Sequence, residues 1–208
     1  MQQKVRFVAA YVASSPEAQK AVDKALRGKI IPDFVQHGIA RTVEVKNGWG
    51  VGTHIGIYGS NYLQRTVTNY AGIWGNSPEE VVYFSLVSDA AGKPADGSNS
   101  YEIHFLANDL PSAVVNAYWS VILVSVPDYR VVPNDLKRYN FNSNSNLTAE
   151  ADGSLKVAIG PKPVKGIPET NWLPAPEGKP FSLTFRAYVP KDIVRQGRWV
   201  PPVVEEVR

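Results

Sequence analysis

The chain has 208 residues, of which 44% are apolar and 20% are charged, and it contains no cysteine. This length corresponds to about one domain, with or without an appendage, and the composition excludes a disordered tail and a collagen-like chain. The absence of cysteine excludes disulfides, thiolate metal sites and cysteine nucleophiles.

The net charge of +3 is concentrated at the N-terminus. Residues 1–30 hold six Lys/Arg and two Asp/Glu, whereas residues 31–208 hold sixteen and seventeen. The main body is therefore nearly neutral, and it lacks the basic stripe that a nucleic-acid-binding protein needs. We interpret the N-terminal surplus of positive charge as a solvated helix face. The alternative is that these residues bind an anionic surface.

The first residues have the charge order of a secretory signal peptide, because Lys4 and Arg6 precede an apolar stretch at 7–13. That stretch is at the short limit and Tyr11 is unfavourable for cleavage, so we predict no intact signal peptide. The longest uncharged run, residues 110–127, is interrupted by prolines and polar residues and is rich in Val, Ile, Tyr and Trp. It predicts a buried strand at 117–126 rather than a membrane span.

Two segments have helical spacing. Ser15-Pro16-Glu17 is typical of a helix start, and Gly28 is expected to end that helix. Residues 39–45 are a candidate short strand. A second helix is expected from Ser60 to Gly72, with an apolar face that needs a partner to pack against.

The rest of the chain indicates strands. We expect them near residues 81–87, 101–106, 117–126, 155–159 and 181–189, where apolar residues alternate with polar ones or where β-branched and aromatic residues gather. The first two are expected to form a hairpin-like pair across the turn-forming residues 89–98, and residues 140–146 to form a polar loop. These elements predict a mainly-β, antiparallel, jelly-roll-like β-sandwich over residues 46–208, with a helical N-terminal extension over 1–45 and one or two short packed helices.

Between these strands lies an ordered set of motifs that resembles the bacterial DUF1214 domain, often found as the C-terminal half of DUF1254/DUF1214 proteins. The motifs fall at residues 56–65, 76–83, 96–105, 117–120, 134–139, 152–155 and 171–176. The resemblance implies a jelly-roll-like sandwich and an extracytoplasmic bacterial protein, periplasmic or secreted, but no established reaction. In place of the usual DUF1254 partner domain, we expect an N-terminal extension of about 45 residues of helix and linker.

Histidine and acidic residues offer limited catalytic chemistry. The three histidines, His37, His54 and His104, lack the spacing of a zinc motif, so we predict no metal site and no cofactor. Glu102 and His104 share one face of a strand, because side chains two residues apart point the same way. Together with Arg138, they define an alternative in which the protein is a hydrolase or lyase.

The abundance of tryptophan and tyrosine favours ligand binding, because aromatic faces with nearby polar groups hold sugars and other amphipathic molecules. We expect a small-molecule or glycan pocket, as in a binding or accessory module, lined by Tyr101, Trp119, Arg138, Tyr139, Asn171 and Trp172. A third alternative is an assembly subunit, in which the N-terminal helix docks on another copy or on a partner domain through Val22, Ala25 and Leu26.

Overall fold

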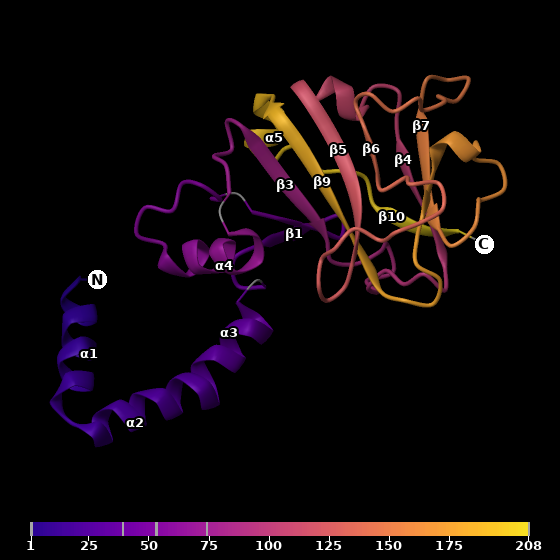
Figure 1. Cartoon of the computed structure of the whole chain (residues 1–208). Helices are drawn as coiled ribbons and strands as arrows, with labels where there is room; N and C mark the ends of the chain where they lie inside the picture. The colour runs from indigo at the N-terminus through magenta and orange to yellow at the C-terminus, as the bar shows by residue number, and fades with distance from the viewer. Residues whose placement is uncertain (1, 39, 53, 74, 208) are drawn as a thin grey trace. The chain divides into compact units, whose positions relative to one another are not determined.

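The computed structural model describes residues 2–38, 40–52, 54–73 and 75–207, and the chain divides into two compact units, Met1–Thr42 and Val43–Arg208. Figure 1 shows the helices of the first unit and the two sheets of the second.

The N-terminal unit consists of helices: α1 (Gln2–Ser14), α2 (Pro16–Ala25), a π-helical turn (Leu26–Ile30) and α3 (Ile31–His37). The predicted start of α2 is confirmed, because the Ser15 hydroxyl accepts a hydrogen bond from the Ala18 N–H at 3.1 Å. The predicted stop at Gly28 is wrong. The backbone stays helical there and widens into a π-turn, in which the Ile31 N–H bonds to the Leu26 carbonyl.

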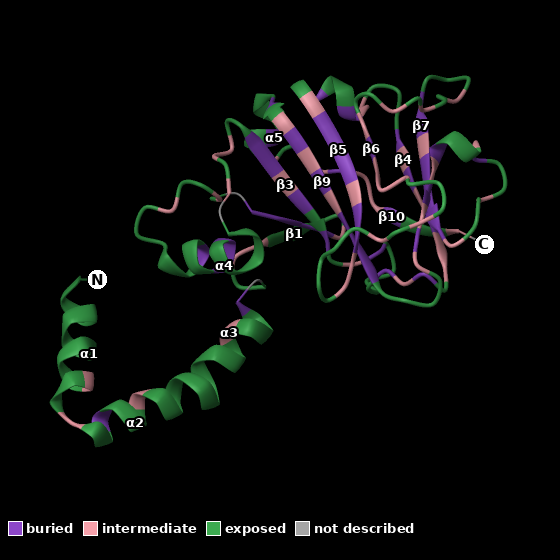
Figure 2. Cartoon of the chain, viewed as in Figure 1, coloured by how far each residue is buried: buried purple, intermediate pink, exposed green. Residues whose placement is uncertain are grey.

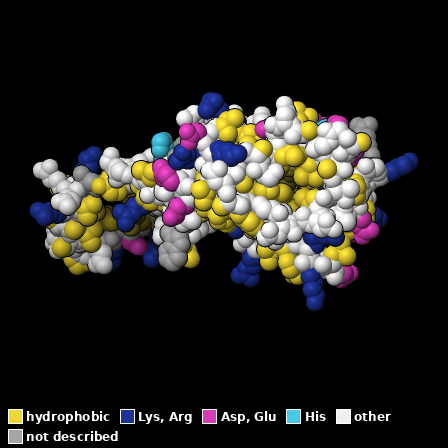
Figure 3. Space-filling model, turned by 90° about the horizontal axis from the view of Figure 1, so that it is seen from above, with side chains coloured by type: hydrophobic (Ala, Val, Ile, Leu, Met, Phe, Trp, Pro, Cys, Tyr) yellow, Lys and Arg dark blue, Asp and Glu magenta, His cyan; other side chains and the backbone are white. Residues whose placement is uncertain are grey.

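Apolar side chains of this unit are exposed to solvent. Phe7 is 73% exposed, and Val5, Val8, Tyr11, Leu26, Ile30, Ile31 and Val35 are exposed as well. At the left of Figure 3, such side chains lie among lysines and arginines. Within the described residues, no helix has both the length and the apolar character needed to span a bilayer. A docking role for this unit stays a prediction.

The second unit begins with a six-stranded antiparallel sheet of order β1-β2-β3-β9-β5-β6. Its strands are β1 (Glu44–Lys46), β2 (Trp49–Val51), β3 (Val81–Leu86), β5 (Val115–Ser125), β6 (Asn140–Asn142) and β9 (Phe181–Pro190). The strands expected near 81–87, 117–126 and 181–189 are thus present. In place of the strand expected at 39–45, the chain turns at residues 40–42 before β1, and residue 39 lies outside the described residues.

The second sheet has the order β10-β4-β7-β8. Its strands are β4 (Ser100–Phe105), β7 (Leu155–Gly160), β8 (Trp172–Pro174) and β10 (Val204–Val207). The pairs β10–β4 and β4–β7 are antiparallel, and β7–β8 is parallel.

The two sheets pack face to face around an aromatic core. Phe185 of β9 lies 6.5 Å from Phe105 of β4 between ring centroids, and it stacks on Trp119 at 6.0 Å. In Figure 2 the strands alternate between buried and less buried bands, as expected when one face of each sheet is covered. The prediction of a mainly-β sandwich with a helical N-terminal segment is confirmed.

The predicted pairing of the first two strands is wrong. β3 pairs with β2 and β9 in one sheet, whereas β4 pairs with β7 and β10 in the other. Residues 89–98 therefore carry the chain from one sheet to the other instead of closing a hairpin. The polar segment expected to be a loop at 140–146 also contains a strand, β6, at the edge of the first sheet.

Short helices complete the second unit. The predicted helix near 60–72 is α4 (Tyr62–Gly72), which begins at the Asn61 side-chain cap and buries Gln64, Val67 and Thr68. Two 3₁₀ turns, Pro111–Ala113 and Glu169–Asn171, precede β5 and β8, and α5 (Asp192–Arg195) follows β9.

Candidate functional site

Arg138 joins two distant segments of the sandwich. Its Nη1 donates hydrogen bonds to the carbonyls of Glu169 at 2.6 Å and Trp172 at 2.7 Å, and its guanidinium lies 5.8 Å from the centre of the Phe141 ring. These bonds attach the loop before β6 to the start of β8. Neither Nε nor Nη2 of Arg138 has a hydrogen-bond partner among the described residues, so part of the guanidinium can still bind a ligand.

The neighbouring predicted residues have structural partners. Asn171 is fully buried, and its Nδ2 donates to the carbonyls of Thr148 and Lys156, each at 2.8 Å. Its Oδ1 accepts the Thr148 N–H at 2.8 Å. The Trp172 indole donates to the Gly160 carbonyl at 2.9 Å. These bonds connect β7 with the start of β8. Because Asn171 is fully buried, it has no exposed surface for a ligand.

Tyr101 and Trp119 lie in the core. Tyr101 is 1% exposed, and its hydroxyl accepts the Asp96 N–H at 3.0 Å. Trp119 is 5% exposed against Phe185. Both point inward because of the two-residue alternation of their strands, whereas Tyr139 is half-buried.

The structure does not bring the six predicted ligand residues into one pocket. A pocket of about 220 Å³ beside Arg138 is lined by Arg138, Asn140, Phe141, Ser145, Asn146 and Thr170. Arg138 is the one predicted residue that it contains.

Glu102 and His104 lie on the outer face of the four-stranded sheet, opposite Ala158 and Lys156 of β7. The Glu102 carboxylate is 3.9 Å from the Lys156 ammonium, and the His104 Nε2 is buried without a hydrogen-bond partner. Among the described residues, no three His, Asp or Glu side chains are close enough together to hold a metal ion. The hydrolase or lyase alternative stays a prediction.

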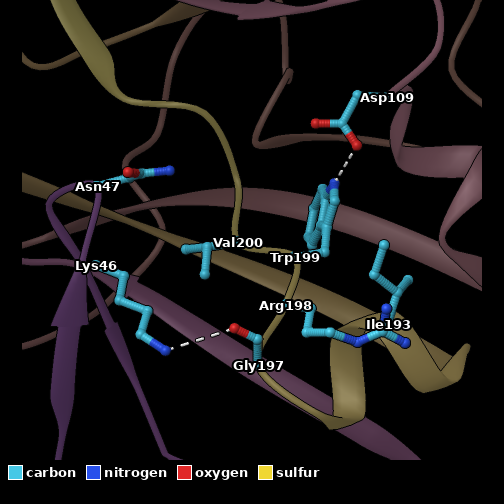
Figure 4. Close-up of a pocket in the computed structure, with 8 residues that line it drawn as sticks. All are labelled: Lys46, Asn47, Asp109, Ile193, Gly197, Arg198, Trp199 and Val200. Carbon is cyan, nitrogen blue, oxygen red and sulfur yellow. Dashed lines mark hydrogen bonds between the residues drawn. The ribbon is translucent and has the colours of Figure 1, made fainter.

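A larger pocket, of about 530 Å³, lies where three distant segments meet (Figure 4). Lys46 ends β1 and Asn47 begins the turn to β2, Asp109 follows β4, and the residues from Ile193 to Val200 follow β9. The full lining is Lys46, Asn47, Asp109, Ile193, Gly197, Arg198, Trp199 and Val200. None of the predicted ligand residues belongs to it.

Trp199 anchors this pocket to the core. It is 4% exposed, and its ring meets Phe84 edge-on at 5.8 Å and Phe185 at 5.5 Å. Its indole N–H donates to Asp109 Oδ1 at 2.7 Å, as Figure 4 shows. The ring therefore positions the Asp109 carboxylate, and the other carboxylate oxygen has no hydrogen-bond partner among the described residues.

Hydrogen bonds from the β1–β2 hairpin fix the opposite wall. Lys46 Nζ donates to the Gly197 carbonyl at 3.4 Å, Asn47 Nδ2 to the Pro201 carbonyl at 3.3 Å and Trp49 Nε1 to the Pro202 carbonyl at 2.8 Å. Asn47 and Gly48 both have positive φ, at 51° and 78°. The Asn-Gly pair between two short strands is the sequence signal that could have located this turn.

Two residues with cationic side chains and unused donors line this pocket. Lys46 Nζ lies 3.3 Å from Glu44 Oε1 in an exposed ion pair. Arg198 Nε donates a hydrogen bond to Gln196 Oε1 at 2.9 Å. The two terminal nitrogens of Arg198 have no partner within the part of the chain that the structure describes. The pocket thus combines two cationic groups with one carboxylate, an arrangement that can bind a ligand having both an anionic group and hydrogen-bond donors.

Comparison with one solved structure supports the fold. The chain is similar to the VPA0106 protein from Vibrio parahaemolyticus, with 26% identity and a TM-score of 0.60 over 93% of this chain and 46% of that one. An uncharacterized protein from Burkholderia cenocepacia aligns over 99% of this chain and 48% of its own, at 14% identity and a TM-score of 0.40. The chain therefore spans about half the length of the solved structures it matches.

No curated protein matches the chain. The model of a family described as "Protein of unknown function (DUF1214)" matches residues 80–192. This match covers more than half of the sequence and includes β3, β4, β5, β7 and β9. The chain belongs to the DUF1214 family.

Proposed function

We propose that the second unit is a binding module for a small polyhydroxy carboxylate, such as a sugar acid, in the pocket of Figure 4. The observation that supports this proposal is that Lys46, Arg198 and Asp109 all line one pocket beside Trp199. Its volume of about 530 Å³ is within the usual range of small-molecule sites.

The chemistry of the lining suggests how such a ligand would bind. The terminal nitrogens of Arg198 would donate to the ligand carboxylate, because charge-assisted hydrogen bonds are the stronger ones, and Lys46 would donate to a ligand oxygen on the other side of the pocket. The Asp109 oxygen that Trp199 does not occupy would accept from a ligand hydroxyl. Because Trp199 is held in the core, this oxygen is already oriented, which reduces the entropic cost of binding.

Isothermal titration calorimetry with gluconate tests the proposal, with sorbitol as the uncharged polyol of the same length. We expect gluconate to bind and sorbitol to bind at least about tenfold more weakly, because the charge-assisted bonds would be lost. Arg198→Gln and Lys46→Gln should each weaken gluconate binding, whereas Lys165→Gln, an exposed lysine outside the pocket, should leave it unchanged. Equal binding of the two polyols, or no effect of the pocket variants, would contradict the proposal.

We also propose an extracytoplasmic location, on the basis of the family resemblance alone. Cell fractionation of the native bacterium with an antibody against this chain tests it. Recovery in the periplasmic or secreted fraction would support this location, and recovery with the cytosol would contradict it.

A further inference from the structure

The outer face of the six-stranded sheet carries a second group of residues suited to binding. On β9, Arg186 lies opposite Tyr83 of β3, and Tyr188 lies opposite Tyr118 of β5. We call Tyr83, Tyr118, Arg186 and Tyr188 the tyrosine–arginine cluster. Because β9 is flanked by β3 and β5 (Figure 1), these four residues lie on one face of three neighbouring strands.

The positive charge of Arg186 is not compensated by the protein. Arg186 is half-buried, and it forms no hydrogen bond or ion pair with any described residue. Its Nε is shielded from solvent and has no partner. Burial is the main cause that raises the pKa of Tyr83, and the nearby Glu80 carboxylate adds only a small effect; Glu80 makes no ion pair with Arg186. A buried N–H without a partner is unfavourable, so the cluster is incomplete until an acceptor binds.

The tyrosines supply both apolar surface and donors. Tyr118 and Tyr188 meet edge to face, with centroids 5.4 Å apart, and no hydrogen bond connects their hydroxyls to described residues. Burial is the main cause that raises the pKa of Tyr83 and of Tyr118, so both phenols keep their protons at neutral pH. All three rings are half-buried and so partly accessible from solvent.

We propose that the tyrosine–arginine cluster is a second binding site, specific for an aromatic carboxylate. The Arg186 guanidinium binds the carboxylate in the bidentate manner that its planar fork favours. The hydroxyls of Tyr118 and Tyr188 donate to the same group or to ring substituents. The aromatic body of the ligand packs against the Tyr118–Tyr188 pair, as aromatic rings do at these distances.

This site differs in chemistry and place from the pocket beside Trp199. The cluster lies on the outer face of β3, β9 and β5, whereas Phe185 and Ala187, the neighbours of Arg186 along β9, point into the core. Alternating side chains on one strand thus separate the cluster from Trp199, which packs on the inward-facing Phe185. The cluster has one cation and three rings, whereas the pocket has two cations and a carboxylate.

The experiment is an NMR titration of the full chain with benzoate, and with benzyl alcohol as the uncharged analogue. The Arg186 Nε–H resonance is the direct reporter, assigned by its absence in Arg186→Lys. We expect a downfield shift of this resonance as benzoate binds, and no such change with benzyl alcohol.

Affinity measurements give the second readout. Arg186→Lys keeps the charge but removes the planar fork, so we expect benzoate affinity to fall at least about tenfold, and Tyr188→Phe to cause a smaller loss. Arg130→Lys, at an arginine with an 83% exposed side chain outside the cluster, should leave benzoate binding unchanged.

The proposal would be overturned if saturating benzoate did not move the Arg186 Nε–H resonance. It would also be overturned if Arg186→Lys bound benzoate with the same affinity as the wild type. Because the gluconate test depends on Lys46 and Arg198, the two proposals succeed or fail separately.

Discussion

The indole of Trp199 donates a 2.7 Å hydrogen bond to the carboxylate of Asp109, a residue 90 positions earlier in the chain. One partner follows β9 in the six-stranded sheet, and the other follows β4 in the four-stranded sheet. The bond therefore connects the ends of strands from the two sheets, and it also sets the position of the acidic group in the larger pocket.

Loss of this bond should destabilise the second unit. Hydrogen bonds to charged groups contribute about 1.5–3 kcal/mol, so we expect Asp109→Ala to lower the free energy of unfolding by an amount in that range. Asp109→Asn keeps an acceptor and should cost less. Urea unfolding followed by tryptophan fluorescence measures the difference. Asp135→Ala, at an exposed aspartate, is the control, and equal stabilities of the three variants would count against the role assigned to Asp109.

Strand positions were predictable because alternation reports which residues are buried. The strand expected at 181–189 is β9 (Phe181–Pro190), with Phe185 in the core and Arg186 on the outer face. Pairing was not predictable in the same way, because alternation does not identify the neighbouring strand. β3 and β4 are close in sequence, but each is hydrogen-bonded in a different sheet. β6 was not predictable from alternation, because an edge strand of three residues needs only one inward apolar side chain, Phe141.

The candidate site was less predictable than the fold. Aromatic residues indicate ligands only when their rings are exposed, and Tyr101 and Trp119 lie on inward-facing positions. The larger pocket is formed by segments far apart in the sequence, so no local motif marks it. The Asn47-Gly48 turn signal predicts a hairpin there, but it does not indicate that the C-terminal segment crosses the same place.

Asn171 should be a structural residue whose loss is costly. Replacement by Ala leaves the Thr148 N–H and the carbonyls of Thr148 and Lys156 without the hydrogen bonds that Asn171 provides. At about 1 kcal/mol for each lost bond, we expect Asn171→Ala to lower the free energy of unfolding by about 3 kcal/mol. Asn144→Ala, at an exposed asparagine in the turn after β6, is the matched control. A stability equal to that of the control would return Asn171 to the group of ligand candidates.

Phe185 is the centre of the aromatic core, with ring contacts to Phe84, Phe105, Trp119 and Trp199. We expect Phe185→Ala to cost about 3–5 kcal/mol, because it removes a buried ring and leaves a cavity. Phe7→Ala, where the side chain is 73% exposed, should change stability by less than about 0.5 kcal/mol. Thermal unfolding followed by near-ultraviolet circular dichroism measures both variants. A similar loss in the two would show that Phe7 is covered in solution, for example by a second copy.

The turn before β7 should make stability fall in acid. Hydrogen bonds from Ser154, through its side chain and its backbone, hold the pKa of Asp152 below its usual value of 3.8. Because the folded-state pKa is lowered, the ionised carboxylate stabilises the fold at pH values above the unfolded pKa. This contribution is lost as the pH falls through the folded pKa. Asp152→Asn keeps an acceptor but cannot be protonated in this range, so its melting temperature should fall less than that of the wild type between pH 5 and about pH 2, the interval in which such a carboxylate titrates. Asp135→Asn, with an exposed carboxylate and no such bond, should follow the wild-type curve. If Asp152→Asn also followed that curve, the Ser154 hydrogen bonds would have no part in the acid sensitivity.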